Sequence, residues 1–178
     1  MDAARPSDPL LRVTRLLLFI AMVLVALTGA ALLAAIPSLW VFGDSIIAAA
    51  ARHGINFGKN ALAAAWVICG LGFAFMALSY QFLRKLVAII DSLGEGSPFI
   101  PENARRLRTM AWMVLAIQGL TLLVAPIAVW LQHAIPYGRV HIVASVSLEG
   151  LIAALLLFIL ARVFDHGIRL EQDVEGTV

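Results

Sequence analysis

A carboxyl group inside an apolar run is the feature of this sequence best suited to chemistry. Glu149 stands in the run from about Ile142 to Ala161, seven residues from its start, and is the only charged residue there. If the run crosses a membrane as a helix, this position lies roughly 10 Å below the surface. An ionisable group that faces lipid at such a depth costs on the order of 3 kcal/mol. We therefore expect Glu149 to face protein or water.

Polar residues at a similar depth in the other apolar runs could complete a site around this carboxyl. Thr28, Cys69 and Thr121 occupy such positions in the first, second and third runs. Ser145 precedes Glu149 by one helical turn on the same face. Two interpretations are open. The group forms a ligand, proton or cation site, or the carboxyl only fixes the packing of neighbouring helices.

The segment from Gly96 to Arg108, GSPFIPENARRLR, is the second candidate, because its prolines and arginines resemble a catalytic or phosphate-binding loop. Proline disfavours a helix until Pro101, which suits a first helical position. Glu102 follows in the first turn, where a helix dipole favours a negative charge. The pattern therefore predicts the start of a helix, and the arginines are interpreted as residues that keep this loop inside the cell.

The sequence gives little support for a metal site or for an enzymatic activity. His53, His133 and His141 could join Asp44 on one side of a membrane, but His133 and His141 are eight residues apart on a loop. That spacing differs from the i, i+4 spacing of helical metal motifs. A single cysteine excludes an intrachain disulfide. No phosphate loop, serine elbow, HExxH helix or carboxylate pair occurs. We expect no enzymatic activity, no metal and no cofactor.

Composition indicates an integral membrane protein. Of the 178 residues, 62% are hydrophobic and only 13% are charged, and the mean hydropathy is +0.95. Soluble domains are nearer to half apolar and a quarter charged. Lysine and arginine (13) barely outnumber aspartate and glutamate (11), so the chain has no strongly basic character that would predict direct nucleic-acid binding.

Four uncharged or nearly uncharged runs are long enough to cross the bilayer. They lie at about residues 16–36, 61–83, 109–132 and 142–161. The first is longer than the roughly 7–15 apolar residues of a signal peptide, so it is predicted to be a membrane span. A short helix from about Ser45 to His53, between a capping Asp44 and Gly54, is expected on the outer surface.

Basic residues near the span ends predict the orientation. Ten of the thirteen flank the first span, occupy the connector 84–108 or begin the tail 162–178, and the other three are Arg52, Lys59 and Arg139. Both termini and the connector are therefore expected in the cytoplasm. The predicted fold is a single all-α integral membrane domain over residues 1–178. It is a four-helix bundle of two hairpins, with cytoplasmic helical extensions and a short outer interfacial helix.

Two segments resemble a bacterial domain-of-unknown-function family, family 2975, of small four-span membrane proteins. They are PFIPENARRLR at 98–108 and LARVFDHGIRLEQDVEGTV at 160–178. Members of this family are often encoded beside a small Cro-like helix-turn-helix regulator. The resemblance therefore implies a cytoplasmic protein partner, and it implies no known activity and no catalytic residue.

Three functions are compatible with these patterns. The first is a non-enzymatic regulator or sensor in the bacterial cytoplasmic membrane, which holds or releases a transcription factor. The second is a small transporter or channel subunit that uses Glu149 within a homo-oligomer. The third is an assembly factor for a membrane complex. For the first, the expected cytoplasmic docking surface consists of Pro98, Phe99, Glu102, Asn103, Arg105, Arg106, Arg108, Arg162, Phe164 and Leu170.

Overall fold

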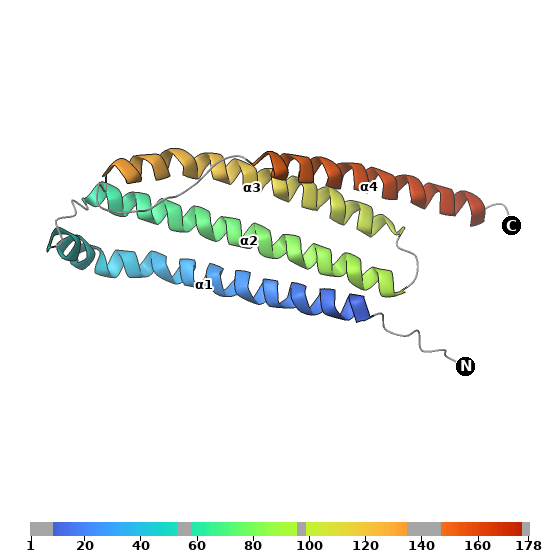
Figure 1. Ribbon diagram of the computed structural model, residues 1–178, viewed down its shortest axis with the longest axis horizontal. Helices are drawn as coiled ribbons and strands as arrows, with labels where there is room; N and C mark the ends of the chain where they lie inside the picture. The colour runs from blue at the N-terminus through green and yellow to red at the C-terminus, as the bar shows by residue number, and fades with distance from the viewer. Residues whose placement is uncertain (1–8, 53–57, 96–98, 135–146, 176–178) are drawn as a thin grey trace.

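All regular structure in the described residues is α-helical. The computed structural model describes residues 9–52, 58–95, 99–134 and 147–175. They form α1 (Pro9–Arg52), α2 (Lys59–Glu95), α3 (Pro101–Ala134) and α4 (Leu148–Glu175), as Figure 1 shows. Each helix is long and apolar enough to cross a membrane. The expectation of an all-helical protein with four candidate membrane spans is confirmed.

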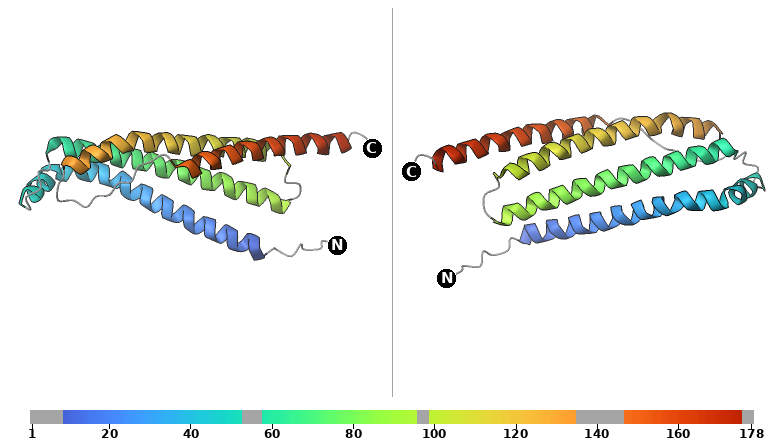
Figure 2. Two further views of the ribbon diagram at one scale, coloured as in Figure 1. Left: turned by 45° about the horizontal axis from the view of Figure 1, so that its top comes forward. Right: turned by 180° about the vertical axis from the view of Figure 1, so that it is seen from behind.

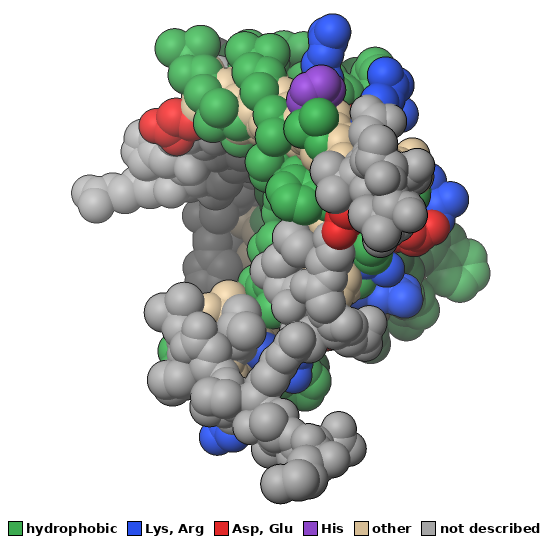
Figure 3. All heavy atoms as spheres, turned by 90° about the vertical axis from the view of Figure 1, so that its right-hand side faces the viewer, with side chains coloured by type: hydrophobic (Ala, Val, Ile, Leu, Met, Phe, Trp, Pro, Cys, Tyr) green, Lys and Arg blue, Asp and Glu red, His purple; other side chains and the backbone are tan. Residues whose placement is uncertain are grey.

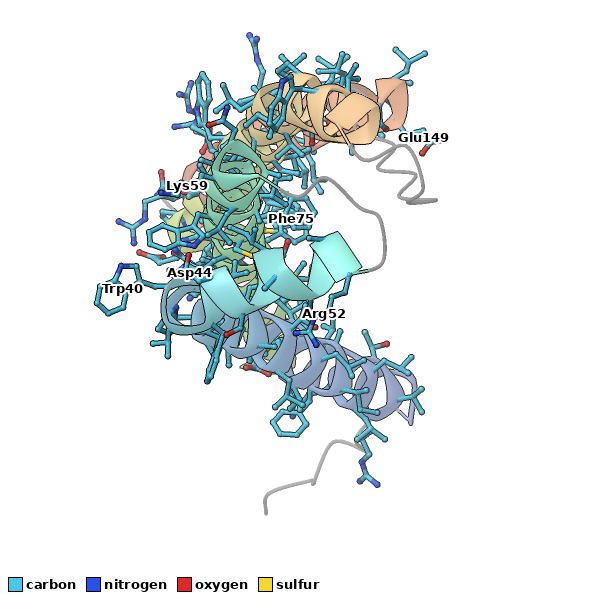
Figure 4. All side chains as sticks on the ribbon, turned by 90° about the vertical axis from the view of Figure 1, so that its left-hand side faces the viewer. Trp40, Asp44, Arg52, Lys59, Phe75 and Glu149 are labelled. Atoms are coloured by element: carbon cyan, nitrogen blue, oxygen red, sulfur yellow. The ribbon has the colours of Figure 1, made fainter. Side chains whose placement is uncertain are left out.

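The four helices form an open, curved row (Figures 2 and 4). In the described residues α1 packs on α2, α2 on α3 and α3 on α4, whereas the backbone of α1 does not approach that of α3 or α4. The four helices of the predicted bundle therefore do not surround one common core. A helix that is apolar all round gives no indication of which face meets protein and which meets lipid. Sequence patterning therefore could not predict whether the row closes.

The predicted interfacial helix from Ser45 is not a separate element. The helix α1 runs without a break from Pro9 to Arg52, through Pro37 and Asp44. Its last part, which carries Asp44 and Arg52, crosses the direction of the earlier part (Figure 4). A Cβ on Gly43 would lie 2.7 Å from the end of the Leu62 side chain, so α1 and α2 approach closely at this glycine. The expected cap at Asp44 was wrong because helical hydrogen bonding continues through this position.

The starts of α3 and α4 are set by local chemistry. The helix α3 begins at Pro101, as the sequence predicts, and Asn103 N donates to Ile100 O at 3.0 Å. The helix α4 begins at Leu148 because Ser147 caps it, with Gly150 N donating to Ser147 Oγ at 3.0 Å. Residues 142–146, which were predicted to begin the fourth span, lie outside the described residues.

One end of the row contains the connection between α2 and α3. At this end α2 finishes and α3 begins, and the first residues of α1 and the last residues of α4 lie on the same side (Figure 1). We call it the connector end. Figure 3 views the molecule from here, with basic side chains spread around the margin. The described parts of both segments that carry the family resemblance, 99–108 and 160–175, fall at this end.

Candidate functional site

Buried side chains from three helices meet at the connector end. Ile89 of α2, Leu107 and Met110 of α3, and Ala161 of α4 form a hydrophobic cluster. Phe82, Leu86, Leu157 and Phe164 pack around it. Elsewhere in the described residues few apolar side chains are fully buried, as expected where lipid rather than protein covers the helices. This cluster is therefore the part of the molecule with a protein-like core.

Asn103 is the polar centre of this core and is fully buried, with an exposure of 0%. Its Nδ2 donates to Ser92 Oγ at 2.7 Å, and Ser92 Oγ donates to Ile89 O at 2.6 Å. Its Oδ1 accepts from an Arg106 guanidinium nitrogen at 2.9 Å. A buried amide is stable only when its hydrogen-bonding groups have partners. Here α2 and α3 together supply those partners.

Arg106 extends the same network to the backbone of α2. The guanidinium nitrogen that donates to Asn103 also donates to Ala88 O at 2.9 Å. Such charge-assisted hydrogen bonds are roughly twice as strong as neutral ones. Arg106 therefore links α3 to α2, and one of its terminal guanidinium nitrogens is directed at protein atoms.

An aromatic contact ties the start of α3 to α4. The Phe99 and Phe164 rings lie 5.3 Å apart at an interplanar angle of 51°. A Cβ on Gly167 would lie 2.6 Å from the Phe99 ring, so the ring occupies the space that a side chain at this position would need. We call Ser92, Phe99, Asn103, Arg106, Phe164 and Gly167 the clasp. It joins α2, α3 and α4 at one end.

Two ion pairs lie beside the clasp. Arg15 meets Asp91 at 2.6 Å between α1 and α2, and Arg108 meets Asp165 at 2.7 Å between α3 and α4. The side chains are 39–58% exposed. Exposed pairs of this kind contribute at most about 1 kcal/mol each. They orient neighbouring helices, while the buried clasp is the stronger connection.

A comparison with family models identifies the chain. Residues 50–178 match the model of the protein family of unknown function DUF2975. The chain belongs to this family. The resemblance seen in the two segments is thereby confirmed for DUF2975. Comparisons with curated proteins and with solved structures find no match.

Both resemblance segments of the DUF2975 chain contribute to the clasp. Residues 98–108 supply Phe99, Asn103 and Arg106, and residues 160–178 supply Phe164 and Gly167. Part of the expected docking surface is therefore internal. Asn103 is not available to a partner, and Arg106 is bound to α2. The sequence alone does not show this, because their partners Ser92 and Ala88 lie on α2.

Other members of the expected docking surface remain accessible. Glu102, Arg105, Arg108 and Arg162 are exposed, and Leu170 is 54% exposed. Phe99 is 37% exposed despite its contact with α4, and Pro98 lies outside the described residues. We call Glu102, Arg105 and Leu170 the rim. Each lies within about one helical turn of a clasp residue, on a backbone that the clasp holds in place.

The polar site expected around Glu149 is not assembled in the described residues. Glu149 is exposed in the first turn of α4, and α1, which carries Thr28, lies at the far end of the row (Figure 4). The apolar run of the sequence hid the cap at Ser147, so Glu149 was placed inside a helix rather than at its start. At that start its charge complements the helix dipole.

The two threonines of that predicted site have partners within their own helices. The Thr28 hydroxyl donates to Leu24 O at 2.9 Å, and the Thr121 hydroxyl donates to Ile117 O at 3.0 Å. Cys69 is half-buried with a free thiol, and Ser145 lies outside the described residues. Back-bonding of this kind satisfies a hydroxyl within its own helix. No group of three or more metal-ligating side chains occurs among the described residues.

Gln118 is a buried polar residue that the sequence patterns did not single out. Its Nε2 donates to Ser147 O at 2.8 Å, and its side chain fills the space beside Gly150. The start of α4 therefore packs against the middle of α3. A glutamine in a long apolar run is the available signal, but its partner can be identified only from the packing of α4.

Proposed function

We propose that this DUF2975 chain is a non-enzymatic regulator or sensor in the bacterial cytoplasmic membrane. In this proposal the connector end faces the cytoplasm and binds a helix-turn-helix transcription factor. The orientation is supported by the concentration of arginine and lysine near this end. The partner is implied by the resemblance to the family.

The observation that carries the proposal is that residues 99–108 have both internal and exposed side chains. Asn103 and Arg106 point into the clasp, while Glu102 and Arg105 between and beside them are exposed. One face of this helical segment is therefore held by a buried network, and the other face is exposed. Such a surface is pre-organised, which lowers the entropy cost of binding a protein.

The clasp also supports a sensing role. It connects the cytoplasmic ends of α2, α3 and α4 to one another, and the rest of each of these helices faces mostly lipid. A shift of one helix in the bilayer would therefore change the positions of clasp residues on its neighbours. A tightly packed interface transmits such a shift because it does not deform continuously.

Co-purification tests this function. The tagged full-length protein should retain a Cro-like helix-turn-helix regulator of the kind often encoded beside members of the family. A rim variant, Arg105→Glu with Leu170→Asp, should weaken retention by about tenfold or more, since central charged and apolar contacts dominate interfaces. Lys59→Glu, at the opposite end of α2, is the matched control and should retain the regulator fully. Absence of the regulator from the wild-type preparation, with unchanged transcription after deletion of the membrane protein, would refute the proposal.

A further inference from the structure

We propose that a groove between α3 and α4 at the connector end binds an anionic phosphate group, carried by a lipid headgroup or free in solution. The groove has a volume of about 460 Å³. It is lined by Arg108, Phe158, Arg162, Asp165, His166 and Arg169. We call it the basic groove. This inference does not depend on the transcription factor.

The helical register of α4 builds one wall of the basic groove. Residues 158, 162, 165, 166 and 169 recur at spacings of three and four, so they share one face of the helix. Arg162, His166 and Arg169 line the groove from this face. The opposite wall is Arg108 of α3. Three guanidinium groups therefore surround a single space.

The charge balance of the basic groove leaves donors for a ligand. Asp165 is the only carboxylate among its lining residues, and it accepts from Arg108 at 2.7 Å. Within the described part of the chain, Arg162 and Arg169 form no ion pair. Guanidinium groups bind phosphate through two parallel N–H···O bonds. Arg162 and Arg169 have the chemistry and the accessibility for this contact.

Aromatic side chains continue the basic groove toward the apolar part of the helices. Phe158 lines it, and Trp112 meets Phe158 edge-on at 5.6 Å and 85°. Trp112 itself is 62% exposed. Tryptophan is enriched where headgroups and acyl chains meet. A lipid could therefore place its phosphate among the arginines and its chains against these rings.

A second polar groove offers a matched control. It is lined by Gln81, Arg84, Lys85, Ala88 and Arg106, with a volume of about 270 Å³. Here one guanidinium nitrogen of Arg106 donates to Asn103 Oδ1 and to Ala88 O. Arg84 and Lys85 carry the same charge as Arg162 and Arg169. They lie on α2 rather than on α4.

Lipid binding to the full-length protein tests the inference. The protein in detergent is titrated with phosphatidylglycerol or phosphatidylcholine, and retained lipid is counted by native mass spectrometry. Phosphatidylglycerol should bind more tightly than phosphatidylcholine. Arg162→Gln with Arg169→Gln should weaken phosphatidylglycerol binding by roughly thirtyfold, while Arg84→Gln with Lys85→Gln changes it less than about twofold. Arg162→Lys with Arg169→Lys should restore part of the affinity, because charge is kept but the bidentate geometry is lost.

Inorganic phosphate distinguishes the two sources. Displacement of phosphatidylglycerol by millimolar phosphate supports a site that also takes the free anion, and its retention supports a lipid site. Equal binding of both lipids to the wild type, or equal losses in the α4 and α2 double variants, would overturn the inference.

Discussion

Replacement of Asn103 with leucine is expected to lower the free energy of unfolding by about 2–4 kcal/mol, since it leaves buried polar partners unsatisfied. Ser92 Oγ would lose the donor at 2.7 Å, and Arg106 would lose an acceptor at 2.9 Å. For a chain of this size the melting temperature should fall by about 5–15 °C. Circular dichroism during thermal unfolding of the purified protein in detergent measures this change in melting temperature.

Arg105→Ala is the control for this substitution. Arg105 lies two positions along α3 and is exposed, so its loss should change the free energy of unfolding by at most about 0.5 kcal/mol. If Asn103→Leu proves as stable as the wild type, the buried network does not hold the connector end together.

Gly167→Ala is expected to destabilise the protein by about 1–3 kcal/mol, because the added methyl group overlaps the Phe99 ring. That methyl carbon would lie 2.6 Å from the nearest atom of the ring. In a Phe99→Ala background the same substitution should cost almost nothing, since the obstructing ring is gone. A double-mutant cycle on melting temperatures and unfolding free energies measures this coupling.

Gly119→Ala provides the matched control in α3. A Cβ there meets no atom within 4 Å. Alanine should therefore leave stability unchanged or raise it by up to about 1 kcal/mol through its helix propensity. Equal destabilisation by both glycine substitutions, or the same cost of Gly167→Ala with and without Phe99, would show that the aromatic contact does not fix α4.

The sequence predicts the elements of this protein better than their contacts. Long uncharged runs predict membrane helices because few other structures satisfy a backbone in lipid. Pro101 predicts the start of α3 because its ring fixes φ and it lacks a donor. These signals are local to the chain, so they can be read without knowledge of packing.

The clasp depends on partners that are distant in sequence. Nothing within 98–108 reveals that Asn103 meets Ser92, or that Arg106 meets Ala88 O, because both partners lie on α2. Gly167 stands in a charged tail, where its contact with Phe99 leaves no local signal. The start of α4 just before Glu149 could not be predicted for a related reason, since the cap at Ser147 lies within an apolar run.

The central claim is that the connector end, with its clasp and rim, lies in the cytoplasm. Single cysteines at Glu102 and at Lys59, in a Cys69→Ser background, can be treated with a membrane-impermeant maleimide before and after the cytoplasmic membrane is opened. We expect the cysteine at position 59 to react from outside and the one at position 102 to react only after opening. Labelling of position 102 in intact membranes, with protection of position 59, would contradict the orientation on which the proposed function depends.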